Sequence, residues 1–134
     1  MRRPTLVLNL LLGSAVAVSI VHYVDNTVRF DDYSPDAGLV TRPMIPLAWV
    51  VFTAFGVWGY LQYRRGRDAR AALGLAVYAG SGLVGPVHYT AVSPSDFDAF
   101  QNVFVVLDTL LGVGVLLFAC WLALGRRALA PAGA

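Results

Sequence analysis

Two short segments hold the residues of this chain that could do chemistry, and each closes a long apolar run. The first is Val21-His22-Tyr23-Val24-Asp25-Asn26, and the second is Val87-His88-Tyr89. On a helix, His22, Asp25 and Asn26 stand at i, i+3 and i+4, so their side chains project from one face. Imidazole, carboxylate and amide groups gathered in this way can bind a metal ion or recognise the polar head of a ligand.

A third polar position lies inside the last apolar run. Asp108 is flanked by valine, leucine and phenylalanine, and Gln101 lies two turns earlier on the same face. Ionisable groups inside a membrane are costly, so they usually face the bundle interior and pair there. From the helical rise of about 1.5 Å per residue, we expect Asp108 to lie several ångströms below His22 and His88. That depth allows long-range pairing or a bridging water.

The first interpretation of these residues is a metal site formed by His22, Asp25, His88 and Asp108. Two imidazoles with one or two carboxylates suit zinc, copper or iron, and an aspartate beside a ligating histidine can orient its ring. With an open coordination position, such a site could activate water for hydrolysis, so the sequence leaves open whether the protein is an enzyme. The further residues predicted to contact a bound ligand are Asn26, Tyr23, Tyr89 and Gln101.

Two other interpretations use the same histidines. In one, His22 and His88 lie at equal depth and are the axial ligands of a b-type haem. Covalent attachment is excluded because no Cys-x-x-Cys-His segment is present. In the other, the histidines hydrogen-bond to Asp25, Asp108 or water, and the network only fixes the register of the helices. The tyrosine beside each histidine would then be an ordinary interfacial residue.

A further interpretation is a non-enzymatic protein that binds a lipid, an isoprenoid or another small apolar molecule. Asp108 or the histidines would recognise the polar head, while Trp49, Phe52 and Phe55 could line an apolar pocket. The four-span layout, with polar residues near the outer ends of the first and third spans, resembles the EXPERA-domain sterol-binding proteins. The resemblance is one of topology, and no functional residue of that family is carried over.

Four apolar runs must position these residues. The chain has 134 residues and is 57% hydrophobic and 13% charged, whereas a soluble domain has about a quarter charged residues. Each run is close to the roughly 20 residues that cross a bilayer as a helix, and none shows the alternation of barrel strands. We therefore predict an all-α integral membrane protein, a single four-transmembrane-helix bundle with up-down-up-down topology over residues 1–134. The predicted spans are 5–24, 44–63, 71–89 and 102–124.

The arginines predict the orientation of the bundle. Two arginines precede the first span, four lie between residues 64 and 70, and two follow the fourth span. The other two loops hold only Arg29 and Arg42, together with most of the aspartates. The positive-inside rule therefore places the N- and C-termini in the cytoplasm of what we interpret as a prokaryotic cell membrane. We expect the first span to be retained as a signal anchor.

The Val-His-Tyr segments also suggest an internal repeat. Both close odd-numbered spans, and Asp32 follows His22 by the same interval as Asp98 follows His88. Two tandem helical hairpins of like orientation would be related by an axis along the membrane normal. An up-down-up-down bundle then places the first and third helices on a diagonal, where the two histidines could face each other.

The third span contains features that predict both close packing and a kink. Ala72, Ala76 and Gly80 recur at every fourth position, as small residues do where membrane helices approach closely. Near the end of this span, Gly82, Gly85 and Pro86 should loosen or kink the helix just below the second histidine. A bundle with such small-residue faces could also form a homodimer or join a larger membrane complex.

The loops yield smaller predictions. Asp25 and Arg29 stand at i, i+4 and should pair. The loop that follows them, to about residue 43, should be irregular or contain a short amphipathic piece. Ser95 or Asp96 is predicted to cap the last helix. The expected partners are membrane lipids, and the charge pattern does not describe a nucleic-acid patch.

Overall fold

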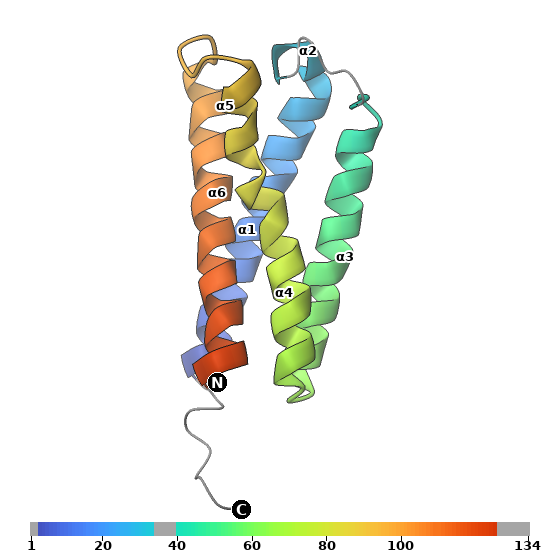
Figure 1. Cartoon of the computed structure of the whole chain (residues 1–134), viewed down its shortest axis with the longest axis vertical. Helices are drawn as coiled ribbons and strands as arrows, with labels where there is room; N and C mark the ends of the chain where they lie inside the picture. The colour runs from blue at the N-terminus through green and yellow to red at the C-terminus, as the bar shows by residue number, and fades with distance from the viewer. Residues whose placement is uncertain (1–2, 34–39, 126–134) are drawn as a thin grey trace, which may run out of the picture.

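The predicted four-helix bundle is confirmed by a computed structural model, which describes residues 3–33 and 40–125. Within these residues, four long helices run alternately up and down (Figure 1). They are α1 (Arg3–Val28), α3 (Met44–Arg64), α4 (Asp68–Leu83) and α6 (Ala99–Cys120). Short elements join or extend them: α2 (Phe30–Tyr33), the 3-10 turn η1 (Gly85–Val87), α5 (His88–Ala91) and the π-helical turn η2 (Trp121–Gly125).

The helices are long and apolar enough to span a membrane. The qualifying segments among the described residues are Arg3–Val28, Met44–Arg64, Asp68–Ala91 and Ala99–Gly125. Their outward faces carry large apolar side chains, so that Leu10, Leu47 and Leu110 are each more than 60% exposed. A contiguous apolar surface of this kind is unfavourable in water and suits hydrocarbon. The fold is therefore that of a membrane protein.

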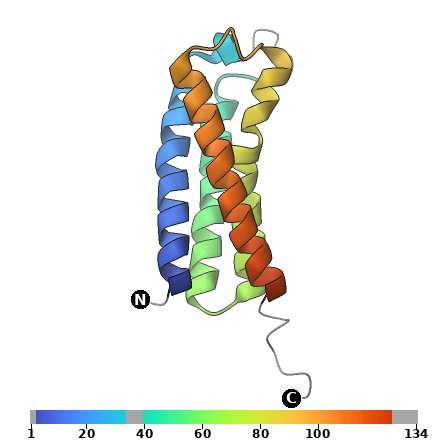
Figure 2. The same ribbon diagram turned by 90° about the vertical axis from the view of Figure 1, so that its left-hand side faces the viewer.

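The four long helices form a ring. Helix α1 packs against α3 and α6, and α4 packs against the same two neighbours, so α1 and α4 lie on a diagonal as predicted. Figure 2 shows α6 crossing the face of the bundle at a tilt. The contact between α1 and α3 is the slightest of the four.

Glycines bring α4 close to both of its neighbours. A Cβ on Gly74 would lie 2.7 Å from the Cα of Gly59 in α3. On the other side, a Cβ on Gly82 would overlap the Asp108 carbonyl oxygen and lie 3.3 Å from the Cα of Gly112 in α6. Small residues therefore let these helix backbones touch inside the bundle.

The predicted stripe of small residues is not where the closest contacts occur. A Cβ on Gly80 would meet only the ring of Phe52, at an ordinary 3.6 Å. The close approaches occur instead at Gly74 and Gly82, because these positions face the neighbouring backbones. Of the predicted stripe, Ala72 is buried in the apolar core and Ala76 packs against it, while Gly80 makes no close backbone contact.

The inner faces of the bundle change from polar to apolar along their length. The buried residues of α6 alternate in steps of four and three: Gln101, Val105, Asp108, Gly112, Val115 and Ala119, with Phe118 beside them. This is the spacing of a helix seam. On α1 the buried residues are Leu8, Ala15, Ser19, His22 and Asn26. The polar members of both sets gather where α2 and α5 close the bundle, which we call the α2 end (top of Figure 1). The opposite end holds the apolar core around Leu8, Leu75, Val115 and Leu122.

The predicted break in the third span is present. Helix α4 ends at Leu83, and the chain continues through η1 into α5. Pro86 has no N–H, so the carbonyl of Gly82 four residues earlier loses its helical donor. A backbone N–H at the C-cap of α4 donates to that carbonyl oxygen instead, and the Thr109 hydroxyl of α6 lies 3.2 Å from it. The same hydroxyl lies 2.8 Å from the Val105 carbonyl oxygen of its own helix. The backbone group that the proline leaves free is thus satisfied at the break, with α6 close by.

The prediction of the last helix cap was wrong by two or three residues. Helix α6 begins at Ala99, and Asp98 is its N-cap. The Asp98 carboxylate accepts from the Gln101 backbone N–H at 2.8 Å, and the Gln101 side-chain oxygen accepts from the Asp98 N–H at 3.0 Å. This reciprocal pair is a capping box. The residues predicted as caps, Ser95 and Asp96, lie in the turn before it.

Replacing Asp98 with alanine should loosen the start of α6. The carboxylate is stabilised by the Gln101 N–H and then by Arg29, which lower the pKa of Asp98. Its contribution is therefore present at neutral pH and is lost as the pH falls through this lowered pKa. Hydrogen exchange of the amides at 99–102 should be faster in Asp98→Ala than in the wild type, and unchanged in the control Asp96→Ala. Equal effects of the two substitutions would contradict the assignment.

Candidate functional site

A buried histidine–aspartate pair forms the centre of the polar cluster. His22 Nδ1 of α1 lies 2.8 Å from Asp108 Oδ2 of α6. Both residues are only 2% exposed. The contact is therefore direct, where the helical rise alone predicted long-range pairing or a bridging water, and it is the histidine–Asp108 hydrogen bond of the register-fixing interpretation. Helix α6 begins at Ala99 and crosses the bundle at a tilt (Figure 2), and its Asp108 meets His22 of α1 directly.

This hydrogen bond decides which nitrogen of His22 carries the lone pair. A carboxylate oxygen can only accept, so Nδ1 donates its hydrogen to Asp108. In neutral imidazole the lone pair then belongs to Nε2. His22 Nε2 is buried and has no hydrogen-bond partner among the described residues. The site therefore presents a buried, unpaired and oriented acceptor.

His88 lies directly beside this acceptor. The two imidazole ring centroids are 5.8 Å apart, with an interplanar angle of 74°. The Asn26 amide nitrogen donates to His88 Nε2 at 3.1 Å, so the lone pair of His88 also lies on Nε2. The predicted approach of the two histidines across the diagonal is confirmed. The Asn26 side-chain oxygen is buried and unpaired in the described structure, like His22 Nε2.

Tyr33 covers the two histidines at the α2 end. Its side chain is fully buried, and its ring centroid lies 4.9 Å from His88 and 6.0 Å from His22. Phe97, from the loop before α6, packs against the Tyr33 ring with a centroid distance of 5.1 Å. The short helix α2 thus places Tyr33, a residue of the first loop, over the two histidines.

A charged network holds this cover in place. The Tyr33 hydroxyl donates to Asp25 at 2.7 Å, and burial together with this bond raises the pKa of Tyr33 above its usual value. Arg29 contacts the other Asp25 oxygen at 3.1 Å, which confirms the predicted i, i+4 pair. Arg29 also contacts Asp98 at 2.5 Å, and this bond raises the arginine pKa. The network ties α1, α2 and α6 together.

The remaining predicted ligand-contacting residues serve different local contacts. Gln101 is buried and belongs to the capping box, although its side-chain nitrogen has no partner in the described structure. The Tyr89 hydroxyl donates to the Asn102 side chain at 2.9 Å. Tyr23 contacts the edge of the His22 ring and lines a groove between α1 and α3. Neither tyrosine is hydrogen-bonded to a histidine.

Of the four predicted metal ligands, the two aspartates are engaged by other side chains, while the two histidines lie side by side. Within residues 3–33 and 40–125, no group of three or more His, Cys, Asp or Glu side chains is placed to hold a metal ion. Asp25 is engaged by Tyr33 and Arg29, and Asp108 is engaged by His22. The two imidazoles and the Asn26 amide are the groups that remain together.

The sequence interpretation missed Tyr33 and the role of Arg29. Tyr33 follows the apolar run by several residues and lies in an acidic stretch that reads as solvated loop. The available signal was the i, i+3 pair Phe30 and Tyr33, whose side chains are both buried. With aspartates between them, these residues form one apolar edge on a single helical turn.

Fold and cluster together define a class: a four-helix membrane protein with a buried His–Asp pair, a second histidine and a tyrosine cover at one end. No family model, curated protein or solved structure matches the chain.

Proposed function

We propose that this protein binds a transition-metal ion between His22 and His88. The observation that supports it is the unpaired Nε2 of His22, buried in the bundle and oriented by Asp108. Metal-ligating histidines commonly give their other ring nitrogen to a carboxylate, which fixes the tautomer and raises the basicity of the ligand. Asp108 is therefore the orienting residue of the proposed site.

The ligands of the proposed site are the Nε2 atoms of both histidines and the side-chain oxygen of Asn26. A ring separation of 5.8 Å suits two imidazoles on one ion, given nitrogen–metal bonds of about 2.0–2.1 Å. Turning the Asn26 amide over would release His88 Nε2 and direct the unpaired oxygen inward. Imidazole ligands favour zinc, copper or iron. An open fourth position would allow the ion to activate water.

A b-type haem is supported less well by this geometry. A porphyrin between the two rings would have to separate side chains that are now in contact. It would also have to displace Tyr33, whose ring lies 4.9 Å from His88. A single ion needs only the reorientation of one amide.

We also propose that the protein lies in a prokaryotic cell membrane with both termini in the cytoplasm. This orientation is supported by the arginines at the start of the first helix, around the turn between α3 and α4 and after the last helix. It would place the α2 end, and with it the metal site, near the outer face of the membrane.

Elemental analysis of the detergent-purified protein, made without chelators, tests the proposal. We expect close to one equivalent of zinc, copper or iron per chain in the wild type. His22→Ala and His88→Ala should each lower this content at least tenfold, because each removes a ligand. An absorption spectrum of the same sample tests for haem through its Soret band.

Gln62→Leu is the matched control. Gln62 is a buried polar residue of α3, near the end of the bundle opposite α2, so its loss should leave the metal content unchanged. Wild-type protein without metal even after incubation with each ion would contradict the proposal. Equal metal content in the wild type and both histidine variants would do the same.

A further inference from the structure

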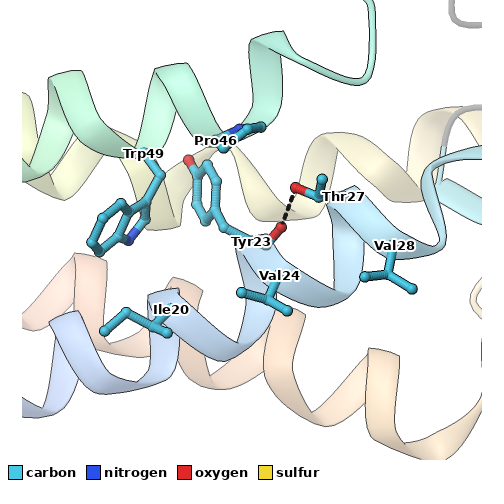
Figure 3. A pocket seen from close by; sticks show the side chains of 7 residues that line it. All are labelled: Ile20, Tyr23, Val24, Thr27, Val28, Pro46 and Trp49. Atoms are coloured by element: carbon cyan, nitrogen blue, oxygen red, sulfur yellow. Dashed lines mark hydrogen bonds between the residues drawn. The ribbon is translucent and has the colours of Figure 1, made fainter.

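A groove opens between α1 and α3 on the outside of the bundle. It has a volume of about 240 Å³ and lies within the two membrane-spanning segments, toward the α2 end. Figure 3 shows Tyr23 reaching from α1 toward Pro46 of α3, with Trp49 beside it. Its lining residues are Ile20, Tyr23, Val24, Thr27, Val28, Pro46 and Trp49.

The polar atoms along the groove are mostly engaged with the protein. The Thr27 hydroxyl donates to the Tyr23 carbonyl oxygen at 2.7 Å (dashed in Figure 3). The Trp49 indole N–H donates to the Ser19 hydroxyl at 3.0 Å. What the groove offers to an occupant is therefore almost entirely apolar. Val24 and Val28 at its edge are 57% and 70% exposed.

The lining suits a flexible chain better than a partner helix. Membrane helices approach each other closely through Gly, Ala and Ser, which let the backbones touch. In this protein the glycines that provide such contacts, Gly59, Gly74 and Gly82, face inward and join α4 to its neighbours. The groove is walled instead by branched and aromatic side chains, which hold another helix backbone away.

We infer that this groove holds one hydrocarbon chain of a membrane lipid as a resident ligand. Its volume of about 240 Å³ lies just below the range of about 300–1,000 Å³ that encloses drug-sized molecules, and its apolar lining would take part of a single hydrocarbon chain. Among the helix contacts of the ring, α1–α3 is the slightest, and a bound chain would complete the packing there. The inference does not depend on the proposed metal site.

Native mass spectrometry of the full-length protein tests this inference. The protein is delipidated in detergent and titrated with dioleoyl phosphatidylglycerol. We expect a single lipid adduct to saturate in the wild type. Val24→Trp should fill the groove and lower the adduct fraction at least fivefold at the same lipid concentration. Val24 is exposed on the outer face, so this substitution leaves the core intact.

Val103→Trp is the control, because Val103 is an exposed apolar residue of α6, 51% accessible and outside the groove. It should retain the wild-type adduct, and both variants should keep wild-type circular dichroism and metal content. Equal adduct fractions in the two tryptophan variants would overturn the inference. So would a wild-type dimer that Val24→Trp dissociates, because the groove would then belong to a second copy of the chain.

Discussion

Replacing Gly82 with alanine should lower the free energy of unfolding by about 3 kcal/mol, near the upper end of overpacking costs. The added Cβ would overlap the carbonyl oxygen of Asp108, and it would lie 3.3 Å from the Cα of Gly112. Backbone atoms cannot rotate away as a flexible side chain can. Helices α4 and α6 must therefore separate, which also lengthens the 3.2 Å contact between the Thr109 hydroxyl and the Gly82 carbonyl oxygen. Denaturant unfolding in detergent, followed by circular dichroism, measures the loss.

Gly13→Ala is the matched control for this prediction. Gly13 lies on α1, and a Cβ there would have no atom within 4 Å. The same chemical change should be neutral, or should stabilise the helix by up to about 1 kcal/mol through its higher helix propensity. A Gly82→Ala protein as stable as Gly13→Ala would show that the α4–α6 contact is looser than the structure has it.

The four-helix bundle and the approach of the two histidines could be predicted from the sequence. Hydropathy defines the four spans because a membrane helix must be apolar over its whole length. The Val-His-Tyr segments end the first and third spans, and alternating helices place both ends on the same side. Diagonal packing then brings His22 and His88 together, at a ring separation of 5.8 Å.

Spacing alone could not predict which of Asp25 and Asn26 faces His88 and which faces Tyr33 and Arg29. At about 100° per residue, Asp25 lies about 60° to one side of His22, and Asn26 lies about 40° to the other. Asn26 therefore faces His88, while Asp25 reaches Tyr33 and Arg29. Which of the two faces the core depends on the rotation of α1 within the bundle. Tertiary packing sets that rotation, so it cannot be predicted from the local sequence pattern.

The pairing of Asp108 with His22 depended on helix tilt. A count of residues from the start of the predicted span places Asp108 well below the histidines. The helix crosses the bundle obliquely, and Asp108 and His22 are in direct contact. Helix α6 also approaches α4 closely at Gly82 and Gly112, which sequence hydropathy does not show.

The His22–Asp108 pair should give the second large effect, as a strong coupling between two substitutions. Asp108→Leu leaves the Nδ1–H of a buried histidine unpaired, and His22→Leu leaves a buried carboxylate unpaired. Breaking one side of such a pair costs about 3–5 kcal/mol. The double variant removes both polar groups, so it should be several kcal/mol more stable than the sum of the single losses implies. Unfolding of all four proteins in the presence of a chelator measures this coupling.

Additive losses would mean that the two side chains do not interact, and they would also undermine the orienting role assigned to Asp108. The same four proteins separate a structural pair from a metal site when the chelator is replaced by zinc. A ligand that binds only the folded state at a hundred times its dissociation constant stabilises it by about 2.7 kcal/mol. Wild type should show this gain, and both variants lacking His22 should not. Asp108→Leu should retain His22 and His88 but bind zinc about 10–100-fold more weakly, the usual cost of losing a carboxylate that orients a ligand.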